Sequence, residues 1–176
     1  MTKRLAVALI GQDRPGIVAS LTGWLLDAGC NLEDVATGIL SGHFAIMLVA
    51  AAPDDLDADA TRAALEALGS SGGFTTAVWE ISGDTATDHP THVITLYGRD
   101  RPGIVHAVAS LMAELGINIC DMTCRLHHSD GELYVVTLEV HVPDGIKQAE
   151  VERQVAHAAA RLEFDSSLRL IEQAEL

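Results

Sequence analysis

The stretch IGQDRPGIV, from Ile10 to Val18, returns almost unchanged as YGRDRPGIV, from Tyr97 to Val105. A shift of 87 positions, which places Gly11 on Gly98, aligns the two copies, and the agreement continues beyond them. Further residues fall in register, namely Gly29, Asn31 and Asp34 on Gly116, Asn118 and Asp121. Chance does not keep so many special residues at one spacing, so the chain consists of two repeats.

The join between the repeats falls in the segment ISGDTATDHPTH, from Ile81 to His92, which is rich in Gly, Thr, Asp and Pro and lacks hydrophobic periodicity. We therefore predict two domains, residues 1–82 and 91–176, connected by a linker at residues 83–90. Each repeat has about 85 residues, which lies within the size range of independent domains.

Each repeat begins with a buried strand that gives way to a helix. RLAVALI, from Arg4 to Ile10, is aliphatic and ends at a glycine, whereas IVHAVASLMAEL, from Ile104 to Leu115, spaces its apolar residues as one face of a helix. Proline suits the first helical turn and glycine suits the position after the last turn. These residues bracket both predicted helices, namely Pro15 and Gly29 in the first repeat and Pro102 and Gly116 in the second.

A hairpin, a second helix and a last strand complete each repeat. In the second repeat, residues 118–127 alternate in polarity, HHSDGE forms the turn and LYVVTLEVHV returns as a strand. Cys120 and Cys124 share the apolar face of the first of these strands, which predicts that both are small core residues. A helix follows at about Ile146 to Leu162, and FDSSLRLIEQ closes as a short strand.

The predicted order of elements is therefore βαββαβ in each repeat. With right-handed crossovers, this order packs two helices on one face of a four-stranded antiparallel sheet. The predicted fold class is α+β, with two tandem ferredoxin-like domains.

The sheet face opposite the helices is apolar in the first repeat. In the strand FAIMLVAA, apolar side chains point to both faces, with Phe44, Ile46 and Leu48 on one and Ala45, Met47 and Val49 on the other. The equivalent strand of the second repeat is more polar on this face, with Thr137, Glu139 and His141. Because a large apolar patch in water marks an interaction surface, we expect the protein to be a homo-oligomer, most simply a dimer.

Charge and composition limit the classes of partner. The chain has 11 Lys and Arg against 25 Asp and Glu, a net charge of -14, which opposes direct binding of nucleic acid or of an anionic membrane. No apolar run approaches the roughly 20 residues that span a bilayer. The amino terminus has no signal-peptide cleavage site, and three cysteines without a paired motif suit a reducing compartment, so we expect a cytoplasmic location.

The motif G-x-D-R-P-G-I-V at the end of a first strand, followed by G-x-N after the first helix, resembles the ACT domain, a small-molecule sensor attached to enzymes and regulators of amino-acid metabolism. Both repeats carry this motif, and a chain of two such units without a further domain is similar to the glycine cleavage system transcriptional repressor family. The resemblance implies a regulatory protein, not an enzyme, that binds an amino acid at the first strand-to-helix loop. It also implies that a neighbouring unit often completes this site.

The residues of the loop suit an amino acid for reasons of their own. A helix start leaves backbone N–H groups unpaired and carries roughly half a positive charge, so it attracts an α-carboxylate. The expected amide donors are Gly16, Ile17 and Val18, with Gly103, Ile104 and Val105 in the second copy. The expected acceptors for the ammonium group are Asp13, Asn31 and Asp34, with Asp100, Asn118 and Asp121 in the second copy, if they share one edge of the sheet. Arg14 and Arg101 complete the candidate set and are expected to face solvent or a carboxylate of a neighbouring unit.

Several alternatives remain open from the residues alone. The Asp-Arg-Pro-Gly motif also fits a simple turn whose aspartate caps the helix. The run of Asp55, Asp57 and Asp59 mimics a calcium loop, but Ala60 stands where that loop requires glycine, so a helix start is expected there. We predict no metal site, no cofactor and no catalytic residues. The function is then control of a partner protein by an amino acid, as in transcriptional regulation, or alternatively a regulatory subunit acting in trans on an enzyme of amino-acid or one-carbon metabolism.

Overall fold

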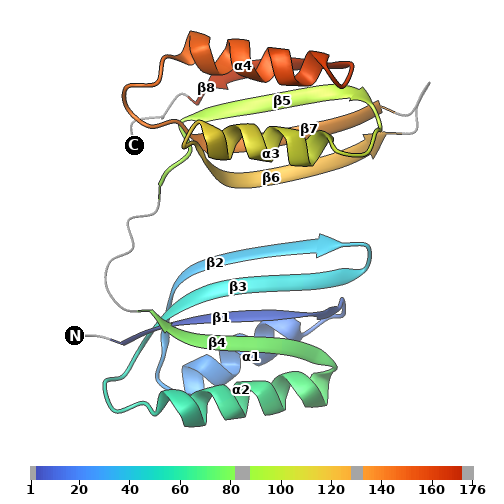
Figure 1. The fold of residues 1–176 in the computed structure, drawn as a ribbon. Coiled ribbons are helices and arrows are strands. Elements are labelled where there is room, and N and C mark those ends of the chain that lie inside the picture. Colours follow the sequence, from blue (N-terminus) through green and yellow to red (C-terminus); the bar gives the residue numbers. More distant parts are fainter. Residues whose placement is uncertain (1–2, 82–87, 128–132, 172–176) are drawn as a thin grey trace. The chain divides into compact units, whose positions relative to one another are not determined.

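A computed structural model describes residues 3–81, 88–127 and 133–171 (Figure 1). The chain divides into two compact units, residues 1–85 and 86–176. Residues 83–87 of the predicted linker, the predicted turn at 128–132 and the last two residues of the predicted closing strand lie outside the described residues. Within the described part of the chain, no helix has the length and apolar character needed to cross a membrane.

Both units have the predicted βαββαβ order. The first unit contains β1 (Lys3–Gln12), α1 (Ile17–Asp27), β2 (Asn31–Leu40), β3 (His43–Ala52), α2 (Ala58–Gly72) and β4 (Phe74–Ile81). The second contains β5 (His92–Arg99), α3 (Ile104–Glu114), β6 (Asn118–His127), β7 (Leu133–His141), α4 (Gln148–Ala160) and β8 (Phe164–Leu170). The strands are antiparallel in the orders β2-β3-β1-β4 and β6-β7-β5-β8. In each unit both helices cover one face of the sheet, so the predicted fold class is confirmed (Figure 1).

Each unit has a core of its own between its sheet and its two helices. In β3 the buried residues are Phe44, Ile46 and Leu48, which is the face that the alternation predicted. They pack in one cluster with Leu21 and Leu25 of α1. The second unit repeats this arrangement, with Val136 and Leu138 of β7 in a cluster with Val108 and Met112 of α3.

The helix boundaries depend on glycines with positive φ. Gly29 and Gly116 follow α1 and α3 at φ 73° and 67°, a conformation in which glycine avoids the steric cost of a Cβ, as predicted. The helices begin at Ile17 and Ile104, so the placement of the prolines in the first turn was wrong. Pro15 and Pro102 precede the N-cap glycines, Gly16 and Gly103, which have φ 93° and 99°.

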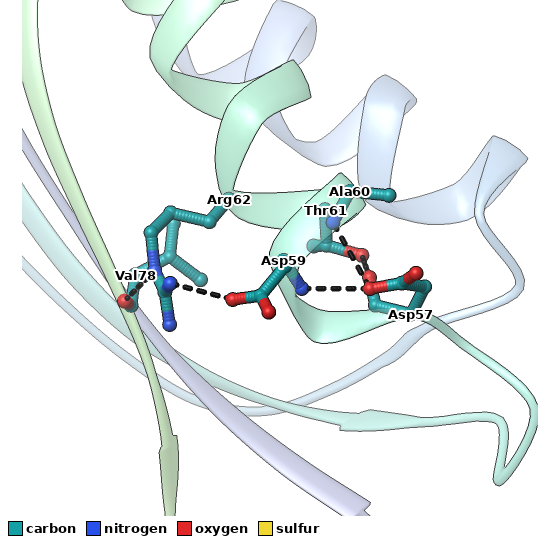
Figure 2. Close-up of polar contacts among 6 residues, drawn as sticks. All are labelled: Asp57, Asp59, Ala60, Thr61, Arg62 and Val78. Atoms are coloured by element: carbon teal, nitrogen blue, oxygen red, sulfur yellow. Dashed lines mark hydrogen bonds and ion pairs between the residues drawn. The ribbon is translucent and has the colours of Figure 1, made fainter.

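The acidic run before α2 forms a helix start, as expected. Asp57 is the N-cap residue, and its carboxylate accepts hydrogen bonds from the backbone N–H groups of Asp59 at 2.9 Å and Ala60 at 3.1 Å (Figure 2). These bonds lower the pKa of Asp57. Arg62 donates to the Asp59 carboxylate and to the carbonyl of Val78 in β4, which ties this end of the helix to the sheet (Figure 2).

The edge strand β6 corrects one expectation. Cys120 and Cys124, predicted as core residues, are both exposed. Every residue of β6 except Ile119 is exposed, and β2 shows the same pattern in the first unit. An edge strand has a neighbour on one side only, and the helices do not cover its inner face, so alternation along it does not produce burial.

Candidate functional site

The loop from Asp13 to Gly16 joins β1 to α1 and is held against the β2–β3 turn. The backbone N–H of Asp13 donates to the carbonyl of Gly42 at 2.9 Å. The first helical hydrogen bond runs from the N–H of Ser20 to the carbonyl of Gly16, also at 2.9 Å. The loop therefore leads directly into a helix start whose position the sheet fixes.

No side chain caps this helix start. Gly16 and Gly103, the N-cap residues, have no side-chain oxygen atom, and no side-chain hydrogen bond caps either helix. The alternative in which Asp13 or Asp100 caps the helix is therefore wrong. The N–H groups of the first helical turn point out of the helix without intrahelical acceptors, and the helix dipole adds positive potential there.

In the first unit this helix start opens into a hollow of about 410 Å³. The hollow brings together five of the predicted site residues, namely Asp13, Arg14, Gly16, Ile17 and Val18. The Ile17 side chain is buried in the core, so its backbone is the part available to a ligand. Pro15 and Ala19 also line the hollow, and Ile39 of β2 and Phe44 of β3 complete its wall. Neither Ile39 nor Phe44 was predicted at the site, because only the strand register brings them to the loop.

Asn31 and Asp34 do not lie at this edge, which corrects the expectation that they share it. Asn31 pairs with Ala51, which pairs with Arg4, nine positions before Asp13 along β1. At a rise of about 3.3 Å per residue, this places Asn31 roughly 30 Å from the loop. Asp34, seven positions away by the same register, is roughly 23 Å from the loop.

The second unit repeats this separation. Asn118 and Asp121 lie at the start of β6, which pairs with the end of β7, whereas Asp100 follows the other end of β5. The amide of Asn118 faces the carboxylate of Asp88 at 3.5 Å. The loop enters the helix at one end of the sheet, and the next strand begins at the opposite end, where the helix finishes. One unit therefore cannot bring its loop residues and the residues at the start of its second strand to the same ligand.

The two arginines of the motif are held inside their own units. The Arg14 guanidinium donates to the carbonyl of Gly72 at 3.2 Å and lies 5.0 Å from the ring centre of Phe74. Arg101 forms an ion pair with Glu163 at the equivalent corner of the second unit. Arg14 is exposed and the Arg101 side chain is 42% exposed, so both reach solvent as expected, but the carboxylate that Arg101 contacts belongs to its own unit. Their contacts attach the loop to the junction between the second helix and the last strand.

The second unit has a different wall beside its loop. Tyr134 of β7 stands where the first unit has Phe44, and Cys124 of β6 stands where it has Thr37. A hydrogen bond with the Cys124 sulfur, partial burial and the negative charge of Asp100 raise the pKa of Tyr134 to about 12. A phenol and a thiol thus lie near Asp100, a predicted site residue. These polar groups are absent from the first unit.

This pKa predicts how the role of Tyr134 depends on pH. Folding favours the neutral phenol, so its stabilising effect is complete below the ordinary tyrosine pKa of about 10 and is lost as the pH rises from 10 to 12. We expect the difference in unfolding free energy between the natural protein and Tyr134→Phe to fall over this interval. Urea titrations of both proteins from pH 8 to 11.5 measure it, and a difference that is constant with pH would contradict the assignment.

His106 lies in the first turn of α3. It is exposed and lines a groove of about 420 Å³ between α3 and α4, together with Ser110, Gln154, His157 and Arg161. In the ranges 3–81, 88–127 and 133–171, no three His, Cys, Asp or Glu side chains gather closely enough to hold a metal ion.

The fold and the loop define a class of protein: a tandem of ferredoxin-like units, each with an uncapped helix start after its first strand. The family model of the ACT domain matches residues 3–78 and 91–168, which together make up most of the sequence. The chain belongs to the ACT domain family.

Some known proteins are similar in sequence to one unit of this chain, and others share its fold over nearly the whole chain. A UPF0237 protein of Methanopyrus kandleri is 37% identical over 67 residues, which are 38% of this chain and 74% of that protein. A UPF0237 protein of Methanosarcina mazei is 34% identical over 71 residues, 40% of this chain and 77% of that protein. These relatives therefore correspond in length to one unit.

Two solved structures share the fold over nearly the full length. A crystal structure of an unknown protein from Galdieria sulphuraria has a TM-score of 0.82 at 24% identity, covering 97% of this chain and 99% of that chain. Another, which carries the provisional description of a glycine cleavage system transcriptional repressor, has a TM-score of 0.74 at 19% identity and covers 97% and 98%. At these identities the likeness concerns the fold.

Proposed function

We propose that this protein is a regulatory amino-acid sensor without catalytic activity. The observation that carries the proposal is the uncapped start of α1 beside a hollow of about 410 Å³, in a chain of the ACT domain family. The α-carboxylate of an amino acid accepts hydrogen bonds from the free amides of the first turn, and the helix dipole favours its charge. Asp13, at the same hollow, accepts from the ammonium group.

The start of the second unit's first helix offers the same amides with more polar walls. Asp100 takes the place of Asp13, and the hydroxyl of Tyr134 and the sulfur of Cys124 replace the phenyl ring and the Thr37 side chain of the first unit. The two units would therefore differ in the side chains that they accept. In this proposal Asn31 and Asp34, or Asn118 and Asp121, contact a ligand only when a second unit brings them to its loop.

The sensed amino acid controls a partner protein by favouring one arrangement of the units over another. The net charge of -14 supports action through a protein partner and opposes direct contact with nucleic acid. Transcriptional control of amino-acid metabolism in the cytoplasm is the form that the sequence analysis favours. The alternative is a regulatory subunit that acts on a metabolic enzyme, and isolation of the bound partner from cells distinguishes the two.

Binding is tested by thermal unfolding with each natural α-amino acid. We expect at least one to stabilise the protein, by about 2.7 kcal/mol at a concentration 100 times its dissociation constant. We expect Gly103→Val to leave the fold largely intact and to remove the response of the second unit, because a β-branched side chain at the N-cap obstructs the close approach of a carboxylate to the amides. Gly16→Val tests the first unit in the same way.

The matched control for Gly103→Val is Gly145→Val. Gly145 has φ 101° against 99° for Gly103, and a Cβ at either position meets no atom within 4 Å. Both variants therefore place valine at nearly the same strained φ, a conformation that is costly for a β-branched residue. Gly145 precedes α4, at the end of the sheet remote from Asp100. Unchanged melting curves with every amino acid, or equal loss of response in both variants, would refute the proposed site.

A further inference from the structure

The sheet face of the first unit opposite its helices, which we call the open face, is apolar at its centre, with Arg4, Asp34 and Thr75 as polar members. Its central residues come from all four strands: Ala8, Ile10, Ala36, Gly38, Ala45, Met47, Val49, Ala77 and Trp79. Ile10 is 53% exposed, Met47 55% and Trp79 43%. Large apolar side chains gathered in this way on one surface mark an interface.

The shape of the open face suits a surface of the same kind. Small residues at its centre, among them Ala8, Ala36 and Ala77, line a hollow of about 440 Å³. The larger Ile10 and Met47 also line this hollow. A surface with both a hollow and projecting apolar side chains can pack against its own copy, because the projections of one fit the hollow of the other.

The second unit shows that the fold does not require this apolar face. At positions equivalent to Met47, Val49 and Trp79 it has Thr137, Glu139 and Arg169. Arg125 and Asp165 are further charged residues on this face, at positions where the first unit has Gly38 and Thr75, whereas Asp121 has a charged counterpart in Asp34. Two units of one backbone fold thus differ sharply on one surface, so the apolar side chains of the first serve an interaction and not the folding of the unit.

We propose that the open face binds the open face of a second copy of this chain, forming a twofold dimer. The charged face of the second unit is an unsuitable occupant, because burying its carboxylates and guanidinium groups against apolar side chains removes water without supplying partners. Two chains of net charge -14 also repel one another, and a face with an uncharged centre brings them together with least added repulsion. A self-complementary patch produces a closed twofold pair.

The area is sufficient for a specific contact. Four strands about 4.8 Å apart and some eight residues long at about 3.3 Å per residue form a face of roughly 500 Å². Two such faces bury about 1,000 Å², at the lower limit for a specific interface. We therefore expect a dimer that dissociates on dilution and that forms more readily as salt screens the repulsion between the chains.

The test is the mass of the full chain in solution, from 1 to 200 µM, by analytical ultracentrifugation in the absence of amino acids. We expect a shift from 18.6 kDa toward twice that value, at lower concentrations in 0.5 M than in 0.05 M NaCl. Met47→Lys, which reduces the net negative charge, should raise the dissociation constant at least tenfold. Thr137→Lys makes the same change in charge on the second unit and should leave the dimer intact.

Two further measurements separate the proposal from a folding defect. Val49→Glu introduces the residue that the second unit has at the equivalent position, so the fold accommodates it, and it should also prevent the dimer. In a Trp24→Phe background, emission from Trp79 should shift to the blue as the dimer forms. A monomer at every concentration, a dimer in both Met47→Lys and Val49→Glu, or Trp79 emission unchanged on association would overturn the proposal. None of these outcomes bears on amino-acid binding at the loops.

Discussion

Leu48→Ala is expected to lower the unfolding free energy of the first unit by about 3 kcal/mol. Leu48 lies in the middle of β3, is 1% exposed and belongs to the core of this unit. Its truncation removes apolar burial and leaves a cavity that a rigid sheet cannot close, a combination that costs about 2–5 kcal/mol for leucine. A unit of about 85 residues has a small total stability, so the loss is a large fraction of it.

Tryptophan fluorescence during urea titration measures this loss in the first unit alone, because Trp24 and Trp79 are the two tryptophans of the chain. The matched control is Leu138→Ala, at the equivalent position of β7 and also 1% exposed. Since the two cores are separate clusters, the control should lower the stability seen by far-ultraviolet circular dichroism but not shift the tryptophan transition. An unchanged midpoint for Leu48→Ala would contradict the assigned core.

Gly11→Ala is expected to destabilise the first unit by about 1–3 kcal/mol, the usual cost of overpacking. A Cβ at Gly11 would overlap the ring of Phe74 and lie 3.0 Å from the carbonyl oxygen of Gly73. The backbone oxygen cannot move without breaking the pairing of β1 with β4. The first glycine of the repeated motif is thus required by an aromatic ring that packs on it, and Gly98 with Phe164 repeats this contact.

Gly38→Ala is the control for this prediction. Gly38 lies in β2 of the same sheet, and a Cβ there meets no atom within 4 Å, so alanine should be neutral or slightly stabilising. Both variants are compared by the tryptophan transition in urea. If Gly11→Ala were as stable as Gly38→Ala, the close contact with Phe74 would not be the reason for this glycine.

Much of the fold followed from local patterns. The copy of GQDRPGIV at GRDRPGIV identified the repeat, and the change from strand to helix after Gly11 and Gly98 follows from residues that are neighbours in the chain. The glycines after both first helices were correctly placed because αL backbone is a local requirement. The prediction that Cys124 is buried was wrong, because burial on an edge strand depends on whether a helix covers it, and the alternation of residues does not report this.

The candidate site also has a part that local sequence predicts and a part that it does not. The sequence by itself determined two βαββαβ units and an amide-rich helix start after each first strand, since propensity, period and turn chemistry act over a few residues. Only the tertiary structure decided which side chains reach that helix start. Antiparallel register brings Phe44 to the loop, removes Asn31 to the far end of the sheet and directs Arg14 to Phe74. These distances are set by strand pairing across dozens of residues, and spacing along the chain does not report them.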